Sequence, residues 1–341
     1  MLPQADRPAS APRPVSQLVP ILCLIGVVAL LSSITPAIKY TLQHSSVDVL
    51  GLACSRVVIG FVFLVGITAW IDLRGLRGLT APNILQLAML GMLGVGAYVV
   101  AAWGLRYTTV THYALLYSLL PTFTTLISIC CGRDRINAIT AWGILVSWTG
   151  CIVAVSNGSW GQSMSFGFGD ALALLFTVMM SCYIVLSPSV VKRVGVWTAN
   201  TTMFGTTAVV LLTGEIANGT VRNGDVSFEV VGLLTFIGAA TAGVFLLRSR
   251  ALQSLTPATV GAYHNLIPVC TIVLAYVLLS ESITMYTLLG APVVLAGTEL
   301  VRRGAFAPVS ARNKSLPSSI GGMVRRTGGA LETEGLGRRS H

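Results

Sequence analysis

The segments 105–128, LRYTTVTHYALLYSLLPTFTTLIS, and 252–275, LQSLTPATVGAYHNLIPVCTIVLA, are two versions of one pattern. A shift of 147 residues, the separation of Pro121 from Pro268, aligns them. Apolar matches are common between apolar helices, but this shift also pairs two glycines and an acid: Gly143 with Gly290, Gly150 with Gly297, and Asp134 with Glu281. We infer an internal duplication.

The composition indicates a chain that resides in lipid. Of its 341 residues, 54% are hydrophobic and 10% are charged, whereas an average soluble domain has roughly a quarter charged residues. Apolar stretches close to the ~20 residues that span a bilayer predict ten helices, at about 17–36, 49–71, 83–104, 111–131, 138–156, 168–189, 196–213, 229–247, 257–279 and 284–301. These stretches lack the alternation of barrel strands, so we expect an all-α membrane protein.

Ten spans in two copies give five spans per copy. Because five is odd, the second copy, 168–303, enters the membrane in the opposite orientation from the first, 17–156. Inverted repeats are typical of secondary transporters, in which two similar halves exchange conformations around a shared site.

The net charge of +10 is explained by topology rather than by nucleic acid, which we do not expect as a partner. With both termini in the cytoplasm, most of the 22 Lys and Arg residues fall on the cytoplasmic side, as the positive-inside rule requires. We therefore predict a multi-pass protein of the cell (inner) membrane. Residues 1–16 are expected to be a flexible cytoplasmic arm, and 304–341 a disordered basic tail.

The sequence contains no recognisable metal, cofactor or catalytic motif. Its seven cysteines show no ligand spacing, so we expect neither disulfides nor metal, and we expect no cofactor. A P-loop is absent, which excludes ATP hydrolysis by this chain. An intramembrane hydrolase would need a nucleophile beside a base such as His264, but no G-x-S-x-G elbow is present. We therefore predict that the protein is not an enzyme.

The segment 251–300, ALQSLTPATVGAYHNLIPVCTIVLAYVLLSESITMYTLLGAPVVLAGTEL, resembles the EamA-type domain of the drug/metabolite transporter superfamily. The matching features are Pro268, Glu281, Gly290 and Gly297. The first half matches more loosely, because "CCGRDRI" leaves Asp134 in place of the acid. The resemblance covers about 17–303. It implies a ten-helix carrier but does not specify the substrate. Members of the family are similar to exporters of amino acids, metabolites or drugs and to importers of small nutrients.

Candidate site residues are the polar or aromatic side chains within the apolar spans, which by default face a cavity or the bundle interior. The duplication places Tyr117 opposite His264 and Ser118 opposite Asn265, which predicts a polar ring near mid-membrane. Pro121 and Pro268 are expected to kink their spans around it. The full set of predicted substrate-binding residues is Arg56, Tyr98, Trp103, Tyr117, Ser118, Tyr263, His264 and Asn265.

A structural interpretation stays open for each of these residues. His264 and Asn265 could instead hydrogen-bond neighbouring helices, Arg56 could bind backbone carbonyls or extend toward the membrane surface, and the aromatic residues could be packing or interfacial side chains. We predict a carrier that moves a small organic metabolite, in the direction of export, and that acts as a monomer or a homodimer. A passive channel or a membrane sensor is the alternative.

Overall fold

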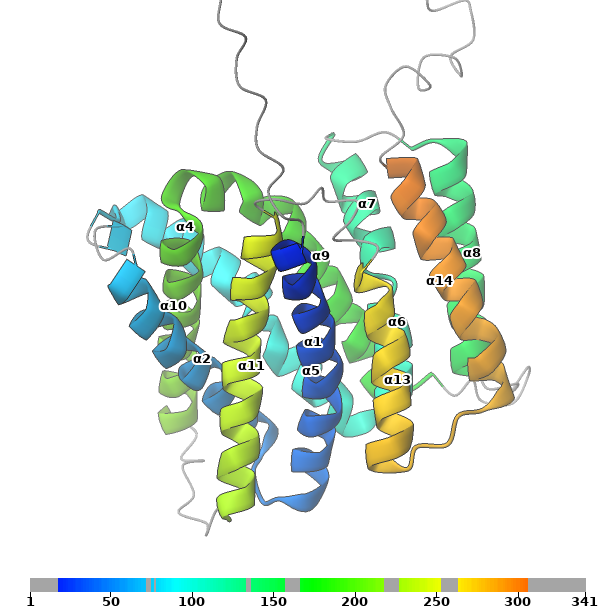
Figure 1. Cartoon of the computed structure of the whole chain (residues 1–341), viewed down its shortest axis with the longest axis horizontal. Helices are drawn as coiled ribbons and strands as arrows, with labels where there is room; N and C mark the ends of the chain where they lie inside the picture. Colours follow the sequence, from blue (N-terminus) through cyan, green and yellow to red (C-terminus); the bar gives the residue numbers. More distant parts are fainter. Residues whose placement is uncertain are drawn as a thin grey trace, which may run out of the picture.

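The computed structural model describes residues 18–71, 75–76, 78–132, 136–156, 166–217, 227–252 and 263–305. The described residues form helices and no strands (Figure 1). The helices are α1 (Leu18–His44), α2 (Val49–Ile71), α4 (Ala81–Gly94), α5 (Ala97–Tyr107), α6 (Val110–Tyr117), α7 (Leu120–Cys130), α8 (Ala138–Ser156), α9 (Phe168–Val194), α10 (Val196–Ala217), α11 (Phe228–Leu252), α13 (Leu266–Leu279) and α14 (Met285–Ala305). The predicted arm 1–16 and nearly all of the predicted tail 304–341 lie outside the described residues.

These helices correspond to the ten predicted spans. Seven segments are long and apolar enough to cross a membrane, namely α1, α2, α4 with α5, α6 with α7, α8, α9 and α11. The less apolar helices α10 and α14, together with α13, complete the set. The main difference lies in the first span, which was expected to end near residue 36 but continues to His44, because α1 passes through Pro36 without ending.

The fourth and ninth spans are interrupted at equivalent positions. Helix α6 ends at Tyr117 and α7 begins at Leu120, while α13 begins at Leu266, directly after Asn265. The linking residues Leu119 and Asn265 keep helical dihedral angles, so each interruption bends the chain without reversing it. Pro121 and Pro268 lie in the first turn after the interruption, where a missing backbone N–H is tolerated.

Contacts between the two repeats occur in pairs that an exchange of the halves interconverts. Contact of α1 with α11 corresponds to that of α9 with α5, contact of α1 with α13 to that of α9 with α7, and contact of α2 with α11 to that of α10 with α4. The end of α1 lies beside the start of α9, because Lys39 binds Thr108 and Thr108 binds Asp170. The chain is therefore an inverted duplication of two five-span repeats.

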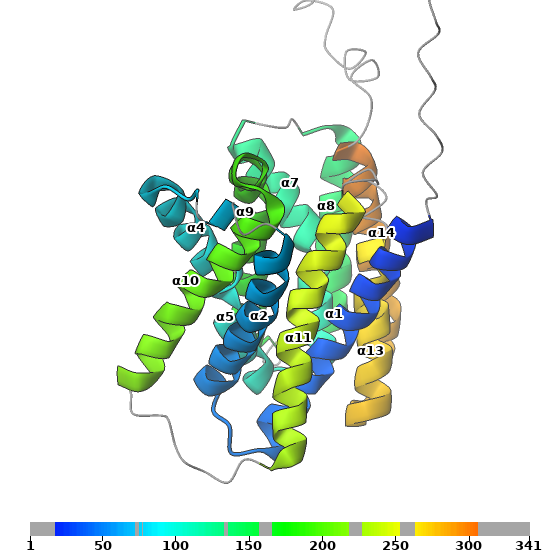
Figure 2. The same ribbon diagram turned by 60° about the vertical axis from the view of Figure 1, so that its left-hand side comes forward.

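Helices α8 and α14, the last span of each repeat, lie side by side at one edge of the bundle (Figures 1 and 2). A Cβ atom on Gly143 would lie 2.8 Å from the carbonyl oxygen of Gly297, and a Cβ on Gly290 would lie 2.6 Å from that of Gly150. These two contacts interconvert when the halves are exchanged. The paired glycines therefore allow the two backbones to approach closely.

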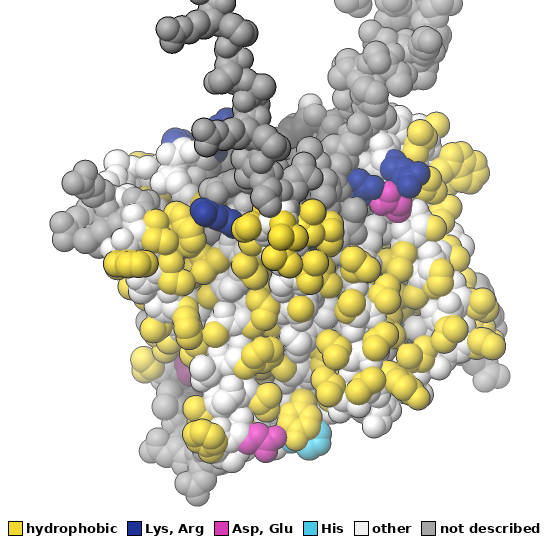
Figure 3. Space-filling view, viewed as in Figure 1, with side chains coloured by type: hydrophobic (Ala, Val, Ile, Leu, Met, Phe, Trp, Pro, Cys, Tyr) yellow, Lys and Arg dark blue, Asp and Glu magenta, His cyan; other side chains and the backbone are white. Residues whose placement is uncertain are grey.

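The surface separates by charge along the helix axes. Lys and Arg side chains gather at the end where α1 begins, and apolar side chains cover the face below them (Figure 3). The exposed apolar residues include Val62, Phe63, Val273, Val277 and Leu289. This distribution fits a bundle whose sides contact lipid.

Candidate functional site

A cavity lies between the two repeats, with about 620 Å³ of space between atoms when its open mouth is included. Residues of α1, α2, α5 and α6 from the first repeat and of α9, α11 and α13 from the second line it. The lining residues are Leu31, Ile34, Thr35, Ile38, Arg56, Tyr98, Leu105, Tyr113, Ala114, Tyr117, Phe176, Met180, Arg248, Ile267, Pro268 and Thr271. None belongs to α8 or α14. The cavity therefore lies in a different part of the bundle from the glycine-lined contact of these two helices, which we call the α8–α14 crossing.

Arg56 is a buried cation on the cavity wall, and only 4% of its surface is exposed. Its Nε atom donates to the hydroxyl of Thr241 at 2.8 Å, and Thr241 in turn donates to the carbonyl of Ile237. The guanidinium lies over the ring of Tyr98, 3.7 Å from the ring centroid. The hydrogen bond and the cation–π contact fix its orientation.

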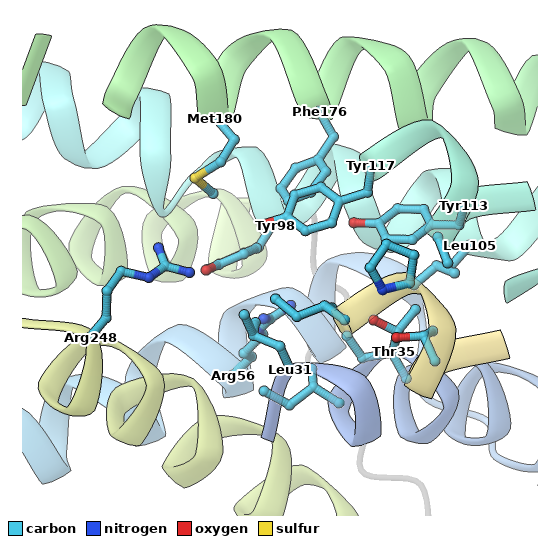
Figure 4. A pocket seen from close by; sticks show the side chains of 16 residues that line it. Leu31, Thr35, Arg56, Tyr98, Leu105, Tyr113, Tyr117, Phe176, Met180 and Arg248 are labelled. Atoms are coloured by element: carbon cyan, nitrogen blue, oxygen red, sulfur yellow. The ribbon is translucent and has the colours of Figure 1, made fainter. Parts of the chain in front are cut away.

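Arg248 brings a second cation to the same cavity from the last part of α11. Its Nη2 atom is 3.2 Å from Nε2 of His264. Figure 4 shows the guanidinium of Arg248 facing the hydroxyl of Tyr98, whose ring covers Arg56. Tyr98 therefore lies between the two arginines and contributes its ring face to one and its hydroxyl end to the other.

Aromatic rings form the opposite wall of the cavity (Figure 4). Tyr113, Tyr117 and Phe176 stack in a cluster with ring centroids 5.6–6.5 Å apart. Tyr113 and Tyr117 share one face of α6 because they are four residues apart, and Phe176 reaches them from α9. The cavity thus combines two cations with a broad apolar surface.

Polar contacts join neighbouring helices, within and between the repeats, at the end of the bundle where α1 finishes. Lys39 donates from Nζ to the carbonyls of Leu105 and Thr108, at 2.7 and 2.8 Å, as expected for a cation at a helix C-terminus. The hydroxyl of Thr108 donates to buried Asp170 on α9. Leu105 also lines the cavity, so these contacts lie next to its end.

Glu281 adds a second link at this end. Its carboxylate accepts from the backbone N–H groups of Val110 and Thr111, at 2.8 and 3.0 Å, and from the hydroxyl of Thr111. A carboxylate there satisfies free donors at the start of α6. Glu281, the acid that the duplication pairs with Asp134, thus caps α6 of the other repeat. Its counterpart, Asp134, lies outside the described residues.

Three of the predicted site residues, Arg56, Tyr98 and Tyr117, line the cavity, as does Pro268. His264 does not line it but contacts Arg248, which does. Asn265 is 3.4 Å from Glu299 on α14, so its hydrogen bond joins two helices.

The remaining predicted residues lie elsewhere. The hydroxyl of Ser118 donates to the carbonyl of Leu115 within its own helix turn. Tyr263 packs against the small cluster of Leu24 and Ala251. Trp103 is 40% exposed and stacks on Tyr107. Pro121 belongs to α7, which contributes no lining residue.

Sequence reasoning did not identify Arg248, Tyr113 or Phe176 as site residues. Arg248 stands in "LLRSR", directly after the predicted span 229–247, and was counted on the cytoplasmic side, but α11 continues to Leu252. Tyr113 could have been found, because its spacing of four residues from Tyr117 places both on one helix face. Phe176 has no distinguishing signal in an apolar segment. Within the described residues, no group of His, Cys, Asp and Glu could hold a metal ion.

Comparison with known proteins shows a family match in both repeats. The EamA-like transporter family model matches residues 18–156 and 167–303. An uncharacterized transporter of Archaeoglobus fulgidus is 23% identical over 74% of this chain and 87% of its own length. The uncharacterized transporter YyaM of Bacillus subtilis is 22% identical over 72% of this chain and 80% of its own.

A solved structure titled "Crystal structure of protein" has the same fold. It matches with a TM-score of 0.59 and 17% sequence identity, and the match covers 88% of this chain and all of that one. Both repeats match the family model, and the helices contact one another as an inverted duplication. The chain therefore belongs to the EamA-like transporter family of the drug/metabolite transporter superfamily, and it is a multi-pass membrane transporter rather than an enzyme.

Proposed function

We propose that this chain is a secondary transporter that moves a small organic metabolite by alternating access, with export as its net direction. The observation that carries the proposal is the position of the cavity between two inverted repeats, with lining residues from both. In such a duplication each half can adopt the conformation of the other, which moves the opening of a central site from one side to the other.

Such a change would break the polar contacts at the end of α1. Lys39, Asp170 and Glu281 hold segments of different spans together beside the cavity. In the state open to that side, we expect these contacts to separate, while the α8–α14 crossing persists because none of its residues borders the cavity. An alternating mechanism requires a set of contacts that forms in one state and separates in the other.

The proposed topology places both termini in the cytoplasm. Lys192, Arg193, Arg250, Arg302 and Arg303 lie in the last turns of α9, α11 and α14, at the end where α1 begins (Figures 1 and 3). The excess of Lys and Arg marks the cytoplasmic side in most membrane proteins. The functional unit is a monomer or a homodimer, since one chain contains a whole cavity.

Counterflow in proteoliposomes tests the proposal. The purified chain is reconstituted and assayed with radiolabelled amino acids, organic carboxylates and cationic drugs, with and without the same unlabelled compound inside. A carrier shows saturable uptake that internal compound stimulates. Arg56→Met is expected to lower this uptake about 10-fold or more, whereas Arg106→Met, at an exposed arginine, should leave it unchanged. Unsaturable uptake without stimulation would indicate a channel and contradict the proposal. Absence of any specific flux across the panel would also contradict it.

A further inference from the structure

We infer that the cavity binds an organic anion: a carboxylate or phosphate group held at Arg248 and Arg56, with an apolar body against the aromatic wall. The inference rests on the proposed function, because it names the class of substrate for the same cavity. It concerns binding, however, and so can be tested separately from transport.

The charged side chains that line the cavity are all cations. Arg56 and Arg248 both line the cavity, and no aspartate or glutamate does. Among the described residues, neither arginine takes part in a salt bridge. The described acids lie near helix ends, as with Glu229 and Glu281. A buried cation without a counter-charge is unfavourable in a membrane protein, and a bound anion would supply that charge.

Arg248 has an unused hydrogen-bond donor. Its Nε atom is buried and has no hydrogen-bond partner among the described residues, while Nη2 contacts His264. Buried polar atoms are nearly always hydrogen-bonded, and a guanidinium has a planar set of donors suited to two oxygens of one anion. Nε of Arg56, by contrast, is already bonded to Thr241. Arg248 is therefore the primary anchor, and Arg56 adds positive charge close by.

The remaining lining residues suit an apolar body on the anion. Beyond the arginines, the lining consists largely of aromatic and aliphatic side chains, including Tyr113, Tyr117, Phe176, Leu31 and Ile34. Stacked rings favour a flat or apolar body. The lining has no carboxylate to pair with an ammonium group. The chemistry therefore favours a simple organic anion over a zwitterion or a cation.

Equilibrium binding to the purified full-length chain tests this inference without transport. The probes are phenylacetate, hexanoate and phenyl phosphate, and the neutral controls are phenylacetamide and hexanamide, which keep the bodies of the two carboxylates. We expect at least one anion to bind about 10-fold or more tightly than its amide; for the phosphate, phenol is the control. The carboxylate and phosphate arms show which oxoanion the site prefers.

Variants locate the anion within the cavity. Arg248→Gln is expected to weaken anion binding by about 10- to 100-fold, the effect of losing charge-assisted hydrogen bonds. Arg250→Gln, at an exposed arginine two residues further along α11, should leave it unchanged. Arg248→Lys keeps the charge without the planar fork, and intermediate binding is expected. If Arg248→Gln does not fold, the comparison of acid with amide in the unaltered protein still tests the inference.

The inference and the proposed function fail differently. The inference is overturned if no anion binds, if amides bind as well as acids, or if folded Arg248→Gln binds anions like the unaltered protein. Counterflow of a neutral or cationic compound without anion binding would overturn it and leave the carrier intact. Anion binding without counterflow of any compound would support the inference and contradict the carrier.

Discussion

The two halves of the duplication have remained alike at the α8–α14 crossing and have diverged around the cavity. At the crossing, the glycines 147 positions apart are retained, Gly143 with Gly290 and Gly150 with Gly297, and they make interchangeable contacts. Around the cavity, the same shift pairs Arg56 with Met203, Tyr98 with Phe245 and Arg248 with Ala101. The crossing retains the duplication because both helices need close approach. The cavity has diverged, and its chemistry comes from residues present in one half only.

The difference separates fold from function. Phe245 packs on Phe204 with ring centroids 5.2 Å apart, and Met203 and Phe204 are completely buried. The positions that correspond to the Arg56–Tyr98 pair therefore form an apolar core in the second half. Because a core needs no arginine in this position, we interpret Arg56 as a residue kept for the cavity.

The largest expected effect is on the crossing. In Gly150→Ala, the added methyl group would lie 2.6 Å from the backbone nitrogen of Val294, and backbone cannot move aside as a side-chain tip does. We expect destabilisation of about 1–3 kcal/mol or more, seen as a lower yield of monodisperse protein and a lower unfolding temperature. Gly232→Ala is the control, because its methyl group would meet nothing within 4 Å. Equal stability of the two variants would contradict a close-packed crossing.

Arg56→Met gives the cavity the residue that the second half carries. The side chain remains long and apolar, so the fold should survive, but the cavity loses one cation and the stacking on Tyr98. We expect counterflow to fall about 10-fold or more, since charged hydrogen bonds contribute roughly 1.5–3 kcal/mol. Circular dichroism and the unfolding temperature report the fold. Loss of folding together with flux would assign Arg56 to structure instead.

Tyr98→Phe sharpens the comparison at a second position, because Phe245 is its counterpart. The ring over Arg56 is kept, and only the hydroxyl that faces Arg248 is removed (Figure 4). Counterflow should weaken about 3- to 10-fold, as expected for removal of one polar group that contributes roughly 1 kcal/mol. Tyr107→Phe, at a 54% exposed tyrosine, controls for loss of a hydroxyl. A similar change in both variants would indicate a general effect.

The smallest effect is expected at Trp103. This residue was a candidate from sequence, but it is 40% exposed and lies away from the cavity. Trp103→Leu keeps an apolar surface, and counterflow should change less than about 2-fold, as for surface substitutions in general. A loss of flux comparable to that of Arg56→Met would place Trp103 on the transport path and show that the cavity is incompletely defined.

Much of the fold could be predicted from the sequence because span length and the repeat register do not depend on how individual side chains pack. Span length and the register of Pro121, Gly143 and Gly150 specify five spans per repeat and their inversion. The glycine pairs and the two interruptions, at 118–119 and 265, agree with that register. The end of α1 was placed too early because the predicted apolar stretch ended at Pro36, whereas a helix can continue past a proline.

The cavity was less predictable because tertiary packing decides whether a side chain points into the cavity or toward a neighbouring helix. Polarity in an apolar span marked Arg56, Tyr98 and Tyr117, which line the cavity, but it also marked Ser118 and Asn265, whose hydrogen bonds are made to a helix turn and to α14. Arg248 was counted on the cytoplasmic side because the predicted span ended at residue 247, and span ends are uncertain by a few residues. One turn of helix decides whether such an arginine reaches inward or outward.

The most direct test of the central claim is the accessibility of Thr271 from each side of the membrane. Thr271 is buried and lines the cavity, whereas Thr124, its counterpart 147 residues earlier, does not line it. In a chain with its seven cysteines replaced, Thr271→Cys and Thr124→Cys are exposed to a membrane-impermeant thiol reagent from one side at a time. We expect Thr271→Cys to react from both sides and Thr124→Cys from neither. Protection of Thr271→Cys from both sides would contradict a transport path through this cavity.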